Sequence, residues 1–258
     1  MRVLAIIQAR MTSTRLPGKA LMRFSGQSML EHVVDRVAKS KLVDEVLVAT
    51  TINRSDLPIV AICAKKGIRV FCGAEDDVLD RFYQAAKIIK PKQILRITAD
   101  CPVIDPEIID QVIAKHLRTH SDYTANTVGA ETFPDGQDAE IFTLKALEKS
   151  WQKARLASER EHVTQFIKKN PKIFKISSII SREDLSSYRW TVDDADDFQL
   201  IKEINAALYK KNHFFSMQDI FKFLKQNPKL NKINSHIGRN EGLKKSLAKD
   251  KIIKRTEG

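Results

Sequence analysis

The sequence predicts an α/β fold with a mostly parallel sheet that helices cover on both faces, and three observations support this prediction. Short apolar runs, beginning with Val3–Ala9, have the length and composition of buried strands. Amphipathic stretches with helix-start signals alternate with these runs. Hydrophobic residues make up 43% of the 258 residues, which is enough for a substantial core. Ligands of such sheets bind beyond the carboxyl ends of the strands, so chemistry is expected there.

The first half of the chain alternates between strand and helix. The predicted helices have start signals, such as the capping box from Ser28 to Glu31 or the Asp105-Pro106 pair. The predicted strands are Val3–Ala9, Glu45–Thr50, Ile68–Cys72, Gln93–Thr98 and Tyr123–Asn126. The predicted helices run from Ser28 to about Lys39, from Ser55 or Asp56 to about Lys66, from Asp76 and Asp77 to about Ile89, and onward from Asp105.

The alternation becomes irregular after Ala130, where Phe133-Pro-Asp-Gly136 predicts a turn. The strands expected beyond it are Glu140–Phe142, Phe174–Ile180 and Tyr188–Thr191. The helices expected there are Leu144–Leu156, Ser158–Lys169, Phe198–Leu208 and Met217–Gln226. We therefore expect one domain over residues 1–228, with a substrate-binding or dimerisation insertion at about 130–180, and a basic tail over residues 229–258.

The sequence indicates a cytoplasmic protein. Val3–Ala9 meets Arg10 too soon to act as a secretory signal, and no apolar stretch is long enough to span a bilayer. Three cysteines without pairwise spacing argue against disulfides or a zinc site. We expect Cys63 and Cys72 to be small core residues and assign no chemistry to Cys101.

The formal net charge of +12 lies mainly at the end of the chain. From Lys222 to Gly258 there are eleven Lys or Arg and three Asp or Glu, so this end carries +8 of the total. A basic tail is usually solvated, although it can also contact an anionic partner through phosphate attraction. Because no recognised nucleic-acid module is present, we do not expect nucleic-acid binding.

Directly after the first predicted strand, three cations, Arg10, Arg15 and Lys19, lie among hydroxyl side chains. A triphosphate needs donors and positive charge around several oxygens, and loop amides, Arg and Lys supply both. Pro17 and Gly18 predict a tight turn that brings Lys19 back toward this site. The spacing matches neither a Walker A loop nor the dinucleotide fingerprint. We interpret residues 10–19, the cationic loop, as a phosphate-binding segment; the alternative is an exposed connection with solvated cations.

Carboxylates follow two of the predicted strands. Asp100 has no helix of its own to cap, and a lone carboxylate at this edge suits Mg²⁺ shared with substrate phosphates. A turn aspartate that bonds its own backbone is the alternative. Asp193 lies closest to the end of a late strand within an acidic cluster. Acidic residues are also common in the first turn of a helix, so its metal role stays open.

Polar residues at the end of the second predicted strand can read a base or ribose. Thr50, Thr51 and Asn53 offer hydrogen-bonding groups at this edge. A strand end followed by a helix cap, with Ser55 or Asp56 as the capping residue, explains part of the segment equally well.

The segment Arg10-Met-Thr-Ser-Thr-Arg15-Leu-Pro-Gly-Lys19 resembles the nucleotide-binding signature of the sugar cytidylyltransferases, which include CMP-ketodeoxyoctonate synthetase and the acylneuraminate cytidylyltransferases. The branch that it resembles most contains spore-coat polysaccharide biosynthesis proteins with cytidylyltransferase homology, and Gln8 fits that branch. The resemblance spans nearly the whole chain. It implies a Rossmann-like, GT-A-like nucleotidyltransferase fold in three layers, CTP as the nucleotide and Mg²⁺ as the cofactor.

The resemblance also implies roles for individual residues. Catalysis would involve Arg10, Lys19 and Asp100, and the metal would be bound by Asp100 and Asp193. Nucleotide contacts are expected from Gln8, Ala9, Arg10, Ser13, Arg15, Lys19, Thr50, Thr51, Asn53, Arg96 and Thr98. Contacts to the sugar are expected from Asp135, Gln137, Glu140, Arg160, His162 and Arg189. Related enzymes pair around this region, so a homodimer is expected.

We therefore expect transfer of CMP from CTP to a sugar acceptor, with release of pyrophosphate, in surface polysaccharide biosynthesis. An acidic keto sugar is the acceptor that the resemblance implies. The first alternative is a nucleotidyltransferase that uses another nucleoside triphosphate with a sugar phosphate. The second is a GT-A glycosyltransferase, whose usual Asp-x-Asp motif is not matched by Asp100-Cys-Pro102. A nucleic-acid-binding or scaffold protein that acts through the basic tail is the non-enzyme alternative.

Overall fold

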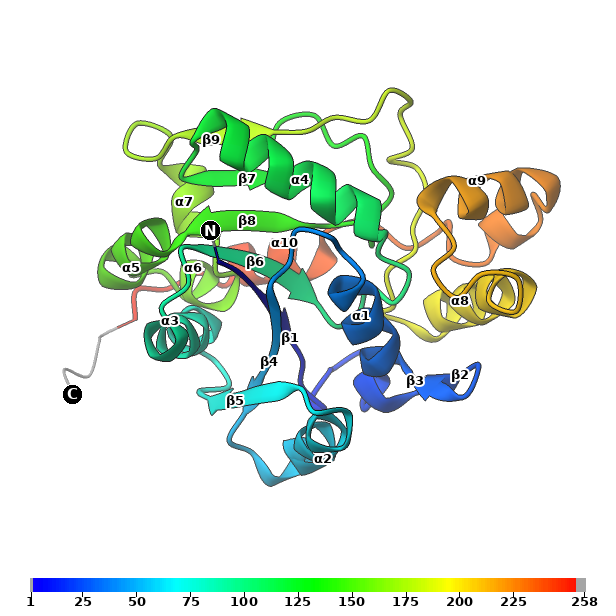
Figure 1. The fold of residues 1–258 in the computed structure, drawn as a ribbon, viewed down its shortest axis with the longest axis horizontal. Coiled ribbons are helices and arrows are strands. Elements are labelled where there is room, and N and C mark those ends of the chain that lie inside the picture. The colour runs from blue at the N-terminus through cyan, green and yellow to red at the C-terminus, as the bar shows by residue number, and fades with distance from the viewer. Residues whose placement is uncertain (1, 254–258) are drawn as a thin grey trace.

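The computed structural model describes residues 2–253, which form an α/β fold around a seven-stranded sheet (Figure 1). The strand order is β5-β4-β1-β6-β8-β7-β9. Only β8 runs antiparallel to its two neighbours, so the mostly parallel sheet is confirmed. The strands are β1 (Val3–Gln8), β4 (Glu45–Thr51), β5 (Arg69–Gly73), β6 (Gln93–Thr98), β7 (Tyr123–Ala125), β8 (Glu140–Thr143) and β9 (Ile176–Ser178).

Helices cover both faces of the sheet because its central strands are apolar on both faces. In β1, Ala5 and Ile7 belong to one buried cluster, whereas Leu4 and Ile6 belong to another. The first cluster includes side chains of α1 (Met29–Ala38), α2 (Leu57–Lys66) and α4 (Pro106–Thr119). The second includes side chains of α3 (Val78–Ile89), α5 (Leu144–Lys153) and α7 (Gln165–Lys169). The short helix α6 (Ala157–Glu161) precedes α7.

A third apolar cluster lies beside the sheet and surrounds the fully buried Trp190. It joins α8 (Ala195–Leu208) and α9 (Met217–Gln226) to the small hairpin of β2 (Arg23–Phe24) and β3 (Gln27–Ser28). Both helices begin with capping boxes, at Asp194 and Ser216. This cluster fixes residues 189–197, which face the cationic loop.

Three local predictions were wrong. Tyr188–Thr191 is not a strand; Arg189 pairs with Asp135 in an isolated bridge, and its side chain is held by carboxylates. The helix expected over Ser158–Lys169 breaks into α6 and α7, where Val163 adopts φ 33° while its side chain is fully buried. Cys72 is exposed, because β5 is an edge strand, whereas Cys63 is buried as expected.

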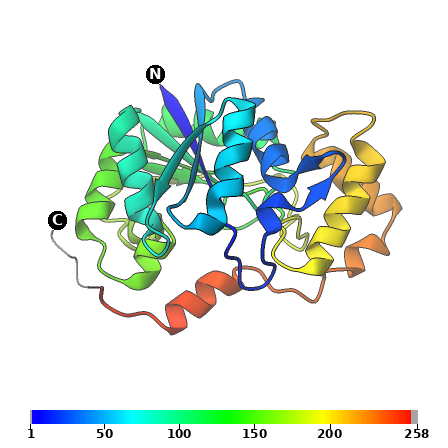
Figure 2. The same cartoon turned by 90° about the horizontal axis from the view of Figure 1, so that it is seen from below.

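The basic tail differs most from its prediction. After Asn234, residues 235–253 form a segment that we call the C-terminal strap, and it contains α10 (Glu241–Ala248). Figure 2 shows the strap in red, running along the carboxyl edge of the sheet beside the blue loop that follows β1. The described part of the tail therefore lies against the domain along a defined course, although every strap residue stays half-buried or exposed. The prediction for its last five residues lies outside the described residues. Within residues 2–253, no helix is both long and apolar enough to cross a membrane.

Candidate active site

The cationic loop folds back on itself because its ends are joined by a backbone hydrogen bond. The amide of Gly18 donates to the carbonyl of Met11 at 3.0 Å, and Gly18 adopts φ 72°, which suits glycine. This turn directs Lys19 under the carboxyl ends of β1 and β6. Its ammonium Nζ lies 3.0 Å from Asp100 Oδ2 and 2.8 Å from Asp193 Oδ1, and it also donates to the Val192 carbonyl.

Lys19 is thus the centre of a cluster that joins the two predicted metal ligands. Burial alone would lower the pKa of Lys19, but Asp100 and Asp193 outweigh it and raise that pKa. Burial likewise opposes ionisation of Asp193, yet Lys19, Arg15 and Arg189 lower the pKa of Asp193 to about 2. Both partners therefore stay charged at neutral pH, which keeps the cluster together.

Asp100 and Asp193 are the residues that could hold a divalent cation together with a substrate. Asp100 and Asp193 reach the same ammonium group, so their oxygens lie close enough to share one cation. Over the described range 2–253, no group of three His, Cys, Asp or Glu side chains forms an all-protein metal site. Mg²⁺ is commonly held by one or two carboxylates together with phosphate oxygens, and this pair suits that arrangement.

A cavity of about 590 Å³ opens beside the cationic loop. The predicted residues that line it are Gln8, Ala9, Arg10, Ser13, Arg15, Lys19, Thr98, Asp100, His162 and Asp193. Arg10 lies 3.6 Å from Glu75 in a partly exposed ion pair, which salt should weaken. The size and the clustered cations suit a nucleoside triphosphate.

A second cavity of about 400 Å³ adjoins the first, and both are lined by Lys19's partners Asp100 and Asp193. The predicted residues that line it include Arg96, Asp135, Glu140, His162 and Arg189. Arg189 binds Asp135, Asp193 and Asp197 at 2.6–3.0 Å. Burial opposes ionisation of Glu140, but Lys168 and Arg96 hold its pKa well below the usual range. These ion pairs give the second cavity a rigid polar wall.

Several predicted contact residues have structural partners instead. The hydroxyls of Thr50 and Thr51 are buried and donate to Asp56 Oδ2 at 2.9 and 2.7 Å, and neither residue lines either cavity. That carboxylate is consequently turned toward β4 and does not cap α2 as expected. Asn53 is half-buried, is absent from the lining of both cavities, and donates to Glu75.

Two substrate-side predictions are corrected in the same way. Gln137 is fully buried and binds the backbone of Asp105 and Val103 at 2.9 and 2.8 Å. Arg160 is buried and binds Asp77 and the Trp151 carbonyl, which joins α6 to the start of α3. Each satisfies buried polar groups of its neighbours, which is the usual fate of a polar side chain inside a fold.

The structure adds residues that the sequence analysis did not select. Arg81 lies in the first turn of α3 and lines the larger cavity; Asp138 and Lys168 line the second. The strap adds seven: Asn240, Glu241, Gly242, Leu243, Lys245, Ser246 and Lys249. An arginine within the apolar face of α3 was a usable signal for Arg81. For the strap, two leucines at helical spacing, Leu243 and Leu247, were a weak signal, since Leu247 is 42% exposed and α10 has no buried residue.

Comparisons with known proteins agree with this geometry. A family model described as cytidylyltransferase matches residues 4–234. The spore coat polysaccharide biosynthesis protein SpsF of Bacillus subtilis is 35% identical, over 88% of this chain and 95% of that protein. The 3-deoxy-manno-octulosonate cytidylyltransferase of Geobacter metallireducens is 38% identical over 44% of each chain.

A solved structure also matches over most of the chain. The cytidylyltransferase from Leptospira borgpetersenii matches with a TM-score of 0.85 and 35% identity, and the match covers 90% of this chain and 97% of that one. The family match includes the cationic loop, Asp100 and Asp193, the residues that meet at Lys19. The chain belongs to the cytidylyltransferase family.

Proposed function

We propose that this chain transfers CMP from CTP to a sugar hydroxyl and releases pyrophosphate, with Mg²⁺ as cofactor. The observation that carries the proposal is the Lys19–Asp100–Asp193 cluster, which lies between two adjoining cavities. A transfer reaction needs two substrates with their reacting atoms side by side. CTP would occupy the cavity beside the cationic loop, and the sugar would occupy the second cavity.

In the proposed reaction, the sugar oxygen forms a bond to the α-phosphorus while the bond from that phosphorus to the β-phosphate oxygen breaks. Pyrophosphate leaves with that electron pair, and the hydroxyl proton passes to solvent or to a neighbouring carboxylate. Arg10, Arg15 and Lys19 would neutralise the phosphate chain as it separates. Mg²⁺ held by Asp100 and Asp193 would supply further positive charge and orient the phosphates.

An acidic keto sugar is the proposed acceptor, for use in surface polysaccharide biosynthesis. The support is the resemblance of the chain to SpsF and, over part of its length, to 3-deoxy-manno-octulosonate cytidylyltransferase. Arg96 and Lys168 are the cations of the second cavity that would meet a sugar carboxylate. Both form ion pairs with Glu140.

The experiment is a pyrophosphate-release screen of CTP, UTP, GTP and ATP against acidic keto sugars, neutral sugars and sugar phosphates, with Mg²⁺ or with a chelator. We expect release with CTP and an acidic keto sugar that the chelator abolishes. Release with UTP, GTP or ATP and none with CTP would contradict the cytidylyl assignment. A CTP-dependent product from a sugar phosphate alone would refute the acceptor class while leaving the cytidylyl transfer intact.

The homodimer and the cytoplasmic location stay predictions. The edge strand β9 supports pairing through residues 130–180, because Ile173 and Ile180 beside it are 43% and 65% exposed. Light scattering of the purified protein would give its mass. A monomer at micromolar concentration would contradict the predicted dimer.

A further inference from the structure

The C-terminal strap lies beyond residue 234, where the match to the cytidylyltransferase family ends, yet it forms part of both cavities. Gly242 lines the larger and the smaller cavity, while other strap residues line one or the other. The strap is therefore a wall of the candidate active site that the family match does not include.

The strap is fixed at three places along its course. Near its start, Arg239 donates to Asp138 Oδ1 at 3.2 Å and to the Phe133 carbonyl at 3.0 Å. In α10, Ser246 Oγ donates to Glu161 and lies 3.0 Å from His162 Nε2. These contacts hold one face of α10 toward the cavity.

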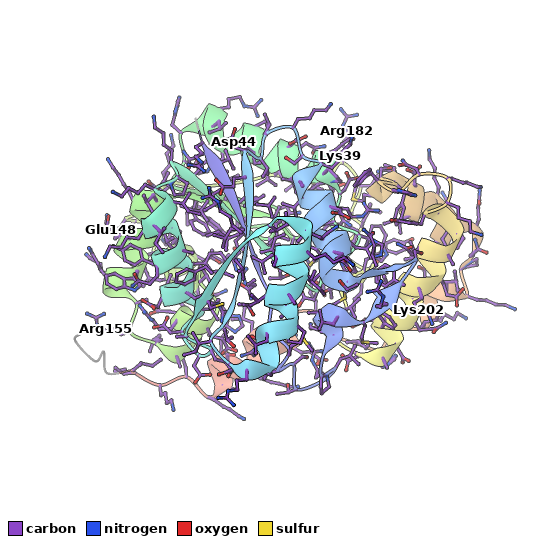
Figure 3. The ribbon with its side chains drawn as sticks, turned by 60° about the horizontal axis from the view of Figure 1, so that its bottom comes forward. Lys39, Asp44, Glu148, Arg155, Arg182 and Lys202 are labelled. Carbon is purple, nitrogen blue, oxygen red and sulfur yellow. The ribbon has the colours of Figure 1, made fainter. Side chains whose placement is uncertain are left out.

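At its far end, Asp250 accepts hydrogen bonds from the amide and the hydroxyl of Ser158 at 3.0 and 2.7 Å. The Ile253 amide then donates to the carbonyl of Arg155. Arg155 is labelled in Figure 3, close to the end of the described chain. Because charged and backbone hydrogen bonds hold both ends, the strap has a defined position over the site.

One face of α10 points into the larger cavity. Gly242, Lys245, Ser246 and Lys249 all line it, and they are spaced by three or four residues, so they lie on the same side of the helix. Lys244 lies on another side of α10 and is not part of either cavity lining. Lys245 of α10 and Lys249, the residue directly after it, thus line the same cavity as the cationic loop.

These two lysines differ from the cations of the loop. Lys19 and Arg15 already lie within 3.5 Å of carboxylates, and Arg10 lies 3.6 Å from Glu75. Among residues 2–253, no carboxylate oxygen lies within 4.0 Å of the ammonium group of Lys245 or Lys249. Their charge is therefore available to an anion in the cavity.

We propose that Lys245 and Lys249 bind the phosphate chain of the nucleoside triphosphate together with the cationic loop. This inference rests on the proposed function, since it assumes a triphosphate in the larger cavity. Ammonium groups recognise phosphate as point charges and do not read a base. The two lysines therefore contribute to affinity for the triphosphate and for pyrophosphate, and they do not select the base.

The test compares two double variants that remove the same charge. K245A/K249A removes the cavity lysines, whereas K244A/K251A removes two strap lysines outside both cavities. Titration calorimetry with Mg-CTP, Mg-UTP, CMP and inorganic pyrophosphate measures the dissociation constant of each. We expect K245A/K249A to raise the dissociation constants of CTP, UTP and pyrophosphate about tenfold and that of CMP much less. K244A/K251A should change each by less than about twofold, because its lost charge is distant and screened.

Equal dissociation constants for K245A/K249A and K244A/K251A would overturn the inference. A loss of affinity that is confined to CTP, or that is as large for CMP as for CTP, would overturn it as well. If the unaltered protein binds pyrophosphate but no nucleotide, the proposed function fails while the lysine contacts can still be measured. If it binds CTP and K245A/K249A binds it equally well, the inference alone fails. Because all four lysines are exposed, unfolding is not expected, and a circular dichroism melt checks this.

Discussion

The ammonium group of Lys19 lies 2.8 Å from a carboxylate oxygen of Asp193, although 174 residues separate them in the chain. This contact connects the cationic loop to the segment before α8. Asp100 completes the cluster from the end of β6 at 3.0 Å. The fold therefore assembles the site from three segments that its sheet and its side cluster bring to one edge.

The first prediction concerns the two carboxylates of this cluster. Asp100→Ala and Asp193→Asn should each lower the rate of pyrophosphate release at least about 100-fold, because each removes a charge that the proposed transfer needs. Circular dichroism should show an intact fold. Asp184→Ala is the control, since Asp184 is an exposed turn residue that bonds the Ser186 amide. Unchanged turnover in Asp100→Ala would remove Asp100 from the proposed metal site.

The second prediction concerns Asp56, whose carboxylate is buried at the end of β4. It accepts from the hydroxyls of Thr50 and Thr51 and from the amides of Thr51 and Met11. Asp56→Ala leaves these donors without an acceptor and should lower the free energy of unfolding by about 3 kcal/mol. Urea titration measures the change. A loss below about 1 kcal/mol would show that water or another side chain replaces the carboxylate.

Asp56 should also contribute to the acid sensitivity of the fold. Burial opposes its ionisation, but hydrogen bonds from Thr51, Met11 and Thr50 outweigh burial and lower the pKa of Asp56 below 3.8. A lowered pKa stabilises the folded state fully above the unfolded pKa, and this is lost as pH falls through the folded value. Below about pH 4, Asp56→Asn should therefore lose less stability per pH unit than the unaltered protein. Parallel slopes between pH 4 and pH 2 would contradict this assignment.

Much of the fold could be predicted because its signals are local. The apolar runs that became β1, β4 and β6 bury both faces, and helix caps such as Ser28 and Asp105 need only their own neighbours. The contact between Lys19 and Asp100 was also within reach, since the carboxyl ends of the parallel strands β1 and β6 meet at one edge, whereas Asp193 follows no strand.

The errors concern groups whose partners are distant in sequence. Thr50 and Gln137 have side chains suited to ligand binding, but in the fold they bond to other parts of the chain. Thr50 donates to Asp56, and Gln137 accepts from the Asp105 amide. The strap was missed because high charge at a chain end resembles a solvated tail. Its position depends on Arg239 meeting Asp138 and on Asp250 meeting Ser158, pairs that are about a hundred residues apart.

The third prediction concerns Gly136, which follows the Asp135 that binds Arg189. It adopts φ 101°, and an added Cβ would lie 2.5 Å from the Thr191 amide and from the Trp190 carbonyl carbon. Gly136→Ala should lower the free energy of unfolding by about 3 kcal/mol or more and weaken the site, because residues 189–193 must move. Thermal melts and urea titration measure this.

Gly26 is a matched control for backbone strain alone. It adopts φ 85° in the β2–β3 turn, and no atom lies within 4 Å of an added Cβ. Gly26→Ala should cost only about 1 kcal/mol and leave activity unchanged. If both variants lose the same stability, the close approach at Gly136 has no energetic weight and the strain explains both.

The last prediction concerns the anchor of the strap at Asp250. Asp250→Ala removes both hydrogen bonds to Ser158 and should let the end of the strap detach. The strap would then complete the wall of the cavities for only a fraction of the time. The apparent dissociation constant of CTP rises in inverse proportion to that fraction, and we expect about a fivefold rise.

Trypsin should cleave the strap faster in this variant, and saturating CTP should slow the cleavage. Ile252→Ala is the neighbouring control; its side chain is 74% exposed and is not a trypsin site, so neither measurement should change. The global unfolding free energy should stay within about 0.5 kcal/mol, since the strap lies outside the three apolar clusters. Faster cleavage with unchanged CTP affinity would mean that the strap moves without forming part of the nucleotide site.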